Sequence, residues 1–251
     1  MPAPVKDRQQ VIGAVPQGSA DERSAALAVR EMFDDIAPRY DLLNHMLSMN
    51  VDRLWWWRTA RSFRSTLLKP GARALDLCCG TGDMASALRR QAPGAEIVGA
   101  DFSRGMLSRG SQKFNSHRIE AVETDALCLP FQNESFDVVV SAFGFRNLAN
   151  YGAGLREIYR VLRPNGEAGI LDFSEPGGLP GKLYGFYFRN VLPKIGTMIS
   201  GVTGPYAYLP ASVSRFPSPD EMLERMLVTG YRDASWRPYT FGIAGLYRAR
   251  K

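Results

Sequence analysis

The chain has 251 residues, 45% of them hydrophobic and 22% charged, which is typical of one globular α/β domain with a full core. Its formal net charge of +6 favours an anionic partner. No apolar run approaches the roughly 18 residues that cross a bilayer, and no signal peptide is recognisable, so we expect a cytoplasmic protein. Three cysteines without ligand spacing and two histidines argue against a metal site.

Two segments precede the regular part of the chain. Residues 1–20 have mixed polarity and no hydrophobic period, so we expect a disordered tail. Residues 21–69 are predicted to form a helical cap, with helices over 21–37 and 51–67. The second helix carries tryptophans at 55–57 beside four arginines. Two interpretations stay open for it: a packed helix with a solvated basic face, or a helix at a lipid headgroup layer.

From residue 70 the chain alternates strands and helices, which predicts a mostly parallel twisted sheet with helices on both faces. The expected strands are 73–77, 96–100, 119–123, 136–141 and 167–173, the expected helices are 83–91, 103–114 and 151–162, and 164–166 is a turn. Residues 176–216 are predicted to be a helix and a mobile loop that cover the substrate site as a lid. A last helix over 219–228 and two strands over 231–239 and 241–249 end the chain, the C-terminal strand antiparallel.

One strand leads into a glycine turn. Residues 74–83 (ALDLCCGTGD) are an apolar run with one acid, followed by Gly-x-Gly and a helical pattern, which is typical of a nucleotide-binding α/β sheet. The next two strands end at or near Asp101 and Asp125. Asp101 is placed to accept hydrogen bonds from ribose hydroxyls, while Asp125 and the Ala126 amide suit an adenine edge. The set predicts a cofactor with an adenosine portion.

The residue at the start of the following helix distinguishes between adenosine cofactors. Residues 80–85 match Gly-x-Gly-x-x-Ala, so a dinucleotide is one candidate. Asp83, however, lies where a pyrophosphate would meet the helix N-terminus and would repel it. An acid there suits an ammonium or sulfonium group. S-adenosylmethionine carries both, which favours methyl transfer over hydride transfer.

These motifs also resemble a known family. Residues 76–83 resemble motif I of class I methyltransferases, and the chain from about 29 to 249 is similar to the UbiE/MenG-type quinone C-methyltransferases of ubiquinone and menaquinone biosynthesis. The matching segments are 40–55 (YDLLNHMLSMNVDRLW), 126–131 (ALCLPF), 143–147 (FGFRN), 160–166 (RVLRPNG) and 171–176 (LDFSEP). The resemblance implies a Rossmann-like class I methyltransferase domain over 21–251 that uses S-adenosylmethionine.

The turn and the resemblance together give the expected site. The expected cofactor-binding residues are Asp76, Gly80, Thr81, Gly82, Asp101, Asp125 and Ala126. Some members of the family carry a serine just after the fourth strand, where this chain has Ala142 next to Ser141. Arg146 and Asn147 are the catalytic candidates, to orient or stabilise a phenolate. His45, Tyr206 and Tyr208 are reserve candidates for proton handling.

The resemblance implies C-methylation of a polyprenylated quinol, namely demethylmenaquinol to menaquinol, with the matching benzoquinol step as the alternative. Such a substrate predicts peripheral contact with an anionic membrane surface through the aromatic residues at 184–188 and the acid-free basic stretch 176–219. No metal and no nucleic acid partner is expected, and nothing in the sequence assigns an oligomeric state. An NAD(P)-dependent oxidoreductase and a non-enzymatic RNA- or membrane-binding module stay open as alternatives.

Overall fold

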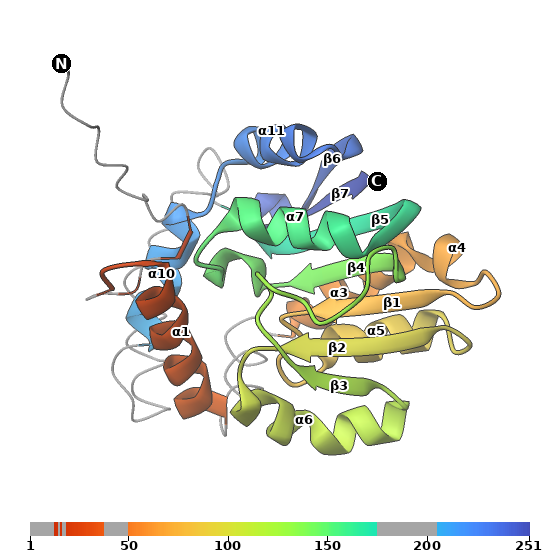
Figure 1. Cartoon of the computed structure of the whole chain (residues 1–251), viewed down its shortest axis with the longest axis horizontal. Helices are drawn as coiled ribbons and strands as arrows, with labels where there is room; N and C mark the ends of the chain where they lie inside the picture. The colour runs from red at the N-terminus through yellow and green to blue at the C-terminus, as the bar shows by residue number, and fades with distance from the viewer. Residues whose placement is uncertain (1–12, 15, 17–18, 38–49, 175–204) are drawn as a thin grey trace.

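A seven-stranded sheet forms the centre of the computed structural model, which describes residues 13–14, 16, 19–37, 50–174 and 205–251 (Figure 1). The strands are β1 (Arg73–Leu77), β2 (Glu96–Asp101), β3 (Glu120–Glu123), β4 (Phe136–Ala142), β5 (Leu162–Phe173), β6 (Arg232–Tyr239) and β7 (Ala244–Arg250). They lie in the order β3-β2-β1-β4-β5-β7-β6. The first five pair in parallel, and β7 is antiparallel to both β5 and β6. The predicted fold class is confirmed.

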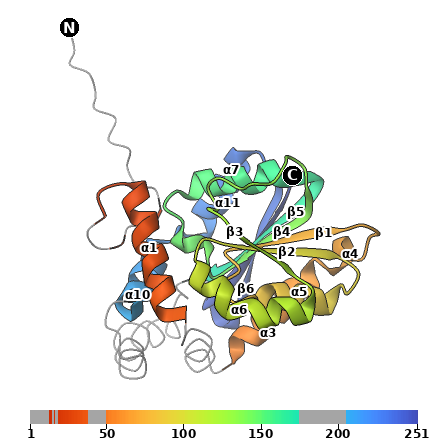
Figure 2. The same ribbon diagram turned by 60° about the horizontal axis from the view of Figure 1, so that its bottom comes forward.

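Helices cover both faces of this sheet. They are α1 (Glu22–Ile36), α3 (Val51–Ser62), α4 (Arg64–Leu67), α5 (Asp83–Gln91), α6 (Arg104–His117), α7 (Tyr151–Val161), α10 (Pro205–Arg215) and α11 (Pro219–Thr229), with short 3₁₀ turns η2 (Phe145–Asn147) and η4 (Thr240–Gly242). Figure 2 shows α3, α5 and α6 on one face and α7 and α11 on the other. None of the described helices is long and apolar enough to span a membrane.

The central strands are apolar because both of their faces are covered. In β4, Val139 contributes to the core beneath α7 and α11, while Val138 and Val140 contribute to the core beneath α3 and α5. This alternation is the two-residue period of a strand. At the start of α6, Ser103 Oγ accepts a hydrogen bond from the Met106 N–H at 3.0 Å, so the predicted cap is confirmed.

Four local expectations differ from the structure. The helix expected over 51–67 breaks at Phe63, whose fully buried ring packs where Gly169 of β5 has no β-carbon. The turn expected at 164–166 is an irregular part of β5, which begins at Leu162 and shifts register opposite β4. Residues 205–210, expected in a loop, are helical in α10 despite Pro210.

The last difference lies near the N-terminus. Within the expected tail, Gly13 and Ala14 are buried, and the Ala14 N–H donates to the Leu148 carbonyl at 2.8 Å. Three longer segments lie outside the described residues: 1–12, 38–49 with His45, and 176–204, which is most of the expected lid.

Candidate active site

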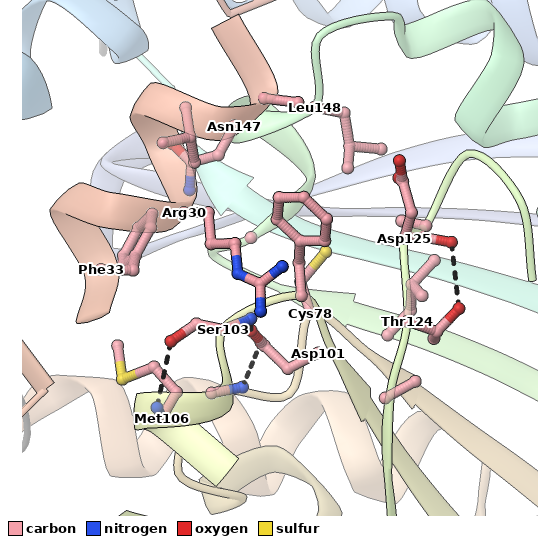
Figure 3. Close-up of a pocket in the computed structure, with 18 of the residues that line it drawn as sticks. Arg30, Phe33, Cys78, Asp101, Ser103, Met106, Thr124, Asp125, Asn147 and Leu148 are labelled. Carbon is pink, nitrogen blue, oxygen red and sulfur yellow. Dashed lines mark hydrogen bonds between the residues drawn. The ribbon is translucent and has the colours of Figure 1, made fainter. Parts of the chain in front are cut away.

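A pocket lies at the carboxyl ends of β1, β2 and β4, with about 780 Å³ of space that includes its mouth open to solvent (Figure 3). Its walls come from α1, from the turn after β1, from the end of β2, and from the segments 124–127 and 142–149. Parallel strands bring these segments together because their carboxyl ends share one edge of the sheet. Apolar side chains make up most of the wall, and two carboxylates, Asp101 and Asp125, lie within it.

Five of the nine expected site residues line this pocket. They are Gly80, Asp101, Asp125, Ala126 and Asn147. Asp76, Thr81, Gly82 and Arg146 are absent from its wall, and each makes contacts behind it instead.

Asp101 ties the glycine turn to the end of β2. Its Oδ2 accepts a hydrogen bond from the Gly80 N–H and its Oδ1 accepts one from the Ser103 N–H, both at 2.8 Å. Burial raises the pKa of the Asp101 carboxyl above its ordinary value, although these amide donors oppose that shift. The carboxylate is therefore held in one orientation at the pocket wall (Figure 3).

The segment after β3 is ordered by its own side chains. Asp125 Oδ1 accepts from the Leu127 N–H at 2.9 Å, and Thr124 Oγ1 donates to the Asp125 carbonyl at 3.4 Å. These contacts form a compact turn that presents Asp125 and the buried Ala126 to the pocket.

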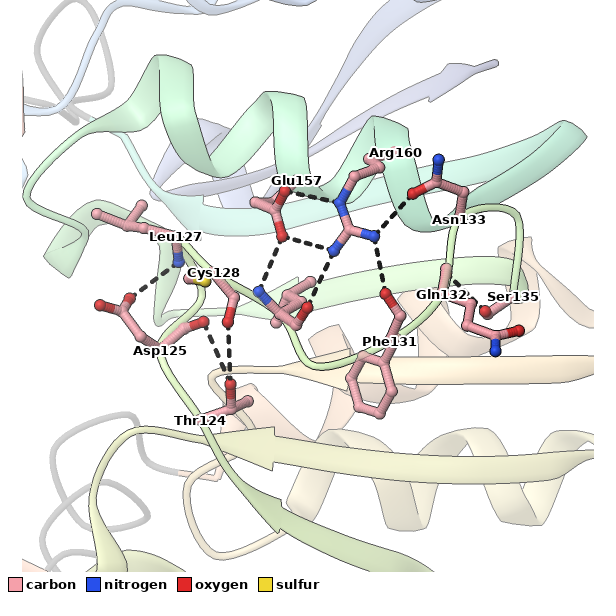
Figure 4. Close-up of polar contacts among 11 residues, drawn as sticks. Thr124, Asp125, Leu127, Cys128, Phe131, Gln132, Asn133, Ser135, Glu157 and Arg160 are labelled. Carbon is pink, nitrogen blue, oxygen red and sulfur yellow. Dashed lines mark hydrogen bonds and ion pairs between the residues drawn. The ribbon is translucent and has the colours of Figure 1, made fainter.

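A clamp from α7 holds the continuation of this segment (Figure 4). The Arg160 guanidinium donates to the carbonyls of Phe131 at 2.7 Å and Leu129 at 3.0 Å. It also pairs with both carboxylate oxygens of Glu157, whose Oε2 accepts from the Leu129 N–H at 2.8 Å. Arg160 begins the RVLRPNG segment, so that motif fixes the loop that carries the pocket residues.

Helix α1 supplies a wall that sequence reasoning missed. Ala26, Val29, Arg30 and Phe33 line the pocket. Arg30 forms an ion pair with Glu123 at 2.6 Å, and its guanidinium lies 5.1 Å from the centroid of the Phe102 ring. The helical period of α1 predicted an apolar face, but nothing local indicated that this face would cover the ends of β2 and β3.

Asp34 on the same helix fastens α1 to the start of α6. Its Oδ1 accepts from the Ser103 hydroxyl at 2.5 Å and from the Gly105 N–H at 2.9 Å. Helix N-termini carry unpaired amides and partial positive charge, so a carboxylate is a favourable partner there. The contact closes the pocket between α1 and the end of β2.

Asp76 and Gly82 shape the turn from behind. Asp76 is fully buried and its Oδ2 accepts from the Ala85 N–H at 2.8 Å, while burial raises the pKa of its carboxyl well above the usual value. Gly82 has φ +89°, and a β-carbon there would lie 2.3 Å from the Phe114 ring. Gly82 is therefore required by helix packing as well as by its backbone conformation.

Asp83 does not supply the negative charge expected of it at the cofactor, and that prediction is wrong. Its Oδ1 lies 2.6 Å from Lys113 Nζ, so its charge is paired, and the residue does not line the pocket. The sequence could not show this partner because Lys113 is on α6. The negative charge at the pocket comes instead from Asp101 and Asp125. Among the described lining residues the single cation is Arg30, and Glu123 neutralises it.

Arg146 lies behind the pocket. It is buried, its Nη1 pairs with Asp172 Oδ1 at 2.9 Å and also donates to the Phe143 carbonyl, and its backbone N–H donates to Asp172 Oδ2 at 3.1 Å. Burial raises the pKa of the Asp172 carboxyl, and the adjacent guanidinium opposes the shift. This pair holds η2 against the end of β5.

Asn147 follows Arg146 and lines the pocket. Its Oδ1 accepts from the Tyr208 hydroxyl on α10 at 3.2 Å, and burial raises the pKa of Tyr208 to about 12. Ala142 lines the pocket as well, whereas the adjacent Ser141 is fully buried and does not. No group of three or more potential metal ligands occurs among the described residues.

Solved structures with the same fold include a SAM-dependent methyltransferase from Thermotoga maritima, with TM-score 0.63 and 17% identity over 88% of this chain and 99% of that one. The [4+2]-cyclase SpnF aligns with TM-score 0.66 and 17% identity over 95% of this chain and 98% of its own. These likenesses confirm the class I methyltransferase fold. They do not determine the reaction, because SpnF is named a cyclase.

Closer relatives share much more sequence. A demethylmenaquinone methyltransferase of Deinococcus radiodurans is 47% identical over 230 residues, covering 90% of this chain and 94% of that protein. A ubiquinone/menaquinone biosynthesis C-methyltransferase of Geobacter sulfurreducens is 44% identical, covering 89% of this chain and 88% of that protein. The model of the ubiE/COQ5 methyltransferase family matches residues 18–251. These matches set aside the oxidoreductase and non-enzymatic alternatives: the chain belongs to the ubiE/COQ5 methyltransferase family.

Proposed function

We propose that this S-adenosylmethionine-dependent methyltransferase methylates a ring carbon of a polyprenylated quinol and converts demethylmenaquinol to menaquinol. The observation that carries the proposal is the 47% identity, over nearly the whole chain, to a protein named demethylmenaquinone methyltransferase. The benzoquinol step is the second candidate, because a relative 44% identical is named for both pathways.

The pocket suits the cofactor. Its two carboxylates, its apolar walls and its lack of an unpaired cation among the described lining residues fit a ligand with hydroxyl groups and positive charge better than a pyrophosphate. We assign Asp101 to the ribose hydroxyls, Asp125 and Ala126 to the adenine, and the Gly80 backbone to the methionine portion. Asp76, Thr81 and Gly82 would act indirectly, by shaping the turn.

When bound, the cofactor supplies an electrophilic methyl group on sulfur. The protein has to align the quinol ring with that methyl group, exclude water, and handle one hydroxyl proton. We assign Asn147 to the substrate hydroxyl, with Tyr208 orienting its amide. A Tyr208 pKa of about 12 keeps that hydroxyl protonated at neutral pH, so Tyr208 would donate hydrogen bonds rather than act as the base. Arg146, paired with Asp172, would position Asn147.

The proposal includes contact with an anionic membrane surface, because the substrate carries an isoprenoid tail. The net charge of +6 supports it. The aromatic residues 184–188 and the part of the acid-free stretch up to residue 204 lie outside the described residues.

The proposal is tested with purified protein, labelled methyl donor, and two acceptors that share one tail: demethylmenaquinol and the matching benzoquinol. We expect label in the naphthoquinol ring. Label in the benzoquinol as well would assign both steps to this enzyme. If neither ring is labelled while the protein still binds S-adenosylhomocysteine, the quinol assignment is wrong and the methyltransferase assignment stands.

A further inference from the structure

The outward face of α3 combines apolar and basic side chains. Leu54, Trp57, Arg58 and Arg61 follow one another at intervals that place them on one side of the helix, and all four are exposed, Leu54 at 48% and Trp57 at 44%. The Arg61 guanidinium lies 5.1 Å from the centroid of the Trp57 ring. Figure 2 shows α3 on the outside of its helix layer.

A second exposed aromatic residue lies beside this helix. Phe241, in the turn between β6 and β7, is 87% exposed and has φ +57°. The left-handed backbone conformation of an aromatic residue costs free energy, and so does the exposure of its ring to water. The Arg58 guanidinium lies 5.2 Å from the Tyr239 ring, and Trp55 Nε1 donates to Thr240 Oγ1 at 2.8 Å, so the turn and α3 are fastened together.

This surface lies at the same edge of the sheet as the pocket. Ala244, the first residue of β7, pairs with Phe173 at the carboxyl end of β5. Trp55 contacts Phe143 with ring centroids 5.8 Å apart, and Phe143 lines the pocket. Trp55, which donates a hydrogen bond to Thr240 in the exposed turn, therefore connects this turn to the pocket wall.

The charged side chains exposed on this surface of α3 are all basic. From residue 53 to residue 75 the sequence has no Asp or Glu, and the one acid on α3, Asp52, is buried. Within the described part of the chain, Arg58 and Arg61 form no ion pair. Arginines without acidic partners beside an indole ring are typical of the layer where lipid headgroups meet acyl chains.

We propose that Leu54, Trp57, Arg58, Arg61 and Phe241 form a docking face that rests on an anionic lipid bilayer. The arginines pair with lipid phosphates, and the apolar side chains enter the headgroup layer. Exposed Leu54 favours lipid over a nucleic acid, which would give an aliphatic side chain little to bind. The inference rests on the proposed function, since a polyprenylated quinol resides in the bilayer and the docking face brings the pocket edge to it.

The test compares two variants with the same loss of charge. Arg58→Gln/Arg61→Gln changes the docking face, and Arg109→Gln/Arg156→Gln changes exposed arginines on α6 and α7. Binding to phosphatidylcholine vesicles with and without phosphatidylglycerol is measured by co-sedimentation. We expect the docking-face pair to weaken binding to the anionic vesicles about tenfold or more, and the control pair to change it less than threefold.

Phe241→Asn tests the apolar part, because asparagine tolerates the left-handed conformation and removes the ring. It should weaken vesicle binding severalfold and leave thermal unfolding unchanged. Equal losses in the two arginine pairs, or RNA binding that depends on Arg58 and Arg61 while vesicle binding does not, would overturn the docking face.

Methylation of a quinol that lacks its tail, assayed without vesicles, separates this inference from the proposed function. The docking-face variants should retain the parent rate there. If all variants methylate the quinol and bind vesicles as well as the parent protein does, the docking face is refuted and the proposed function stands. Methylation of no quinol, with vesicle binding that still depends on Arg58 and Arg61, refutes the proposed function alone.

Discussion

Two buried carboxylates and one half-buried carboxylate support the floor and wall of the pocket. Asp101 is the last residue of β2, and Asp76 and Asp172 are the penultimate residues of β1 and β5. Burial raises the pKa of each of these carboxyls. A raised pKa means that the folded protein still holds a proton at a pH where the unfolded chain, with ordinary aspartate values near ~3.9, has released it. The free energy of unfolding should therefore fall as pH rises from that value to the folded pKa.

Asp76→Asn should flatten this dependence. Asp76 Oδ1 has no hydrogen-bond partner among the described residues, so its charged form is poorly compensated. Relative to the parent protein, the variant should gain roughly 1.4 kcal/mol of unfolding free energy for each pKa unit that folding adds to the carboxyl. Urea unfolding at several pH values between about 4 and 8 measures this difference in the free energy of unfolding.

The control for this change is Glu120→Gln, an exposed carboxyl on β3. It should leave the slope of unfolding free energy against pH unaltered. Equal slopes for the parent protein and Asp76→Asn would contradict the assignment of the pH dependence to Asp76.

Single residues were predictable where topology fixes their place. Asp101, Asp125 and Ala126 are expected at one edge because parallel strands end there, and all three line the pocket. Asp83 was misread because its neutralising partner, Lys113, lies on another helix. Arg146 was expected at the substrate, yet Asp172 on β5 binds it behind the pocket. Side-chain pairs between elements leave no local pattern in a sequence.

Helix α1 illustrates the same limit for a whole element. Its span was predicted from hydrophobic period and from the proline that follows it, but its partners were not. Helix α10 shows the reverse case: Pro210 favoured a loop, whereas burial of Val213 and of Phe216 just after the helix stabilises it. Packing against distant residues outweighed local propensity there.

Gly105→Ala tests whether α1 acts as a wall of the cofactor pocket. A β-carbon at Gly105 would lie 2.8 Å from Asp34 Oδ1 and 3.3 Å from Asp34 Cα, so α1 would have to move outward. Alanine also favours the helical state of α6 by up to about 1 kcal/mol. We expect S-adenosylhomocysteine to bind about three- to tenfold more weakly by calorimetry, with no loss of thermal stability.

The matched control is Gly94→Ala, where a β-carbon would meet nothing within 4 Å. Its affinity should equal that of the parent protein. Unchanged affinity in Gly105→Ala would show that α1 does not form part of the binding surface.

For the whole molecule, the pocket joins parts of the chain that are far apart in sequence. It draws on α1, the ends of β1 and β2, the segment after β3 and the segment after β4. A ligand bound there contacts most of the sheet edge and should stabilise the entire fold. The mostly parallel sheet with helices on both faces was implied by the alternation of strands and helices, so the architecture was the most predictable level.

Ligand-linked stability provides the matching test. At a hundredfold excess over its Kd, S-adenosylhomocysteine should add about 2.7 kcal/mol, which raises Tm by roughly 5–10 °C in a chain of this size. Asp101→Asn should lose most of this shift because it removes the charged ribose acceptor. Asp220→Asn, at an exposed position on α11, should keep the shift. A full shift in Asp101→Asn would disprove the role of Asp101.

The ring of Phe114 has a consequence for how this sequence is able to vary. It occupies the space that β-carbons would take at Gly82 and Gly110 and lies within 3.5 Å of where one would stand at Gly99. One aromatic side chain on α6 thus fills the volume left by two glycines and touches the space beside a third. Substitutions at 114 and at these glycines should covary among related proteins, since volume gained at one position must be given up at another. The glycine turn is usually interpreted as a nucleotide-binding signature. In this chain its Gly82 is also needed to make room for the Phe114 ring of α6.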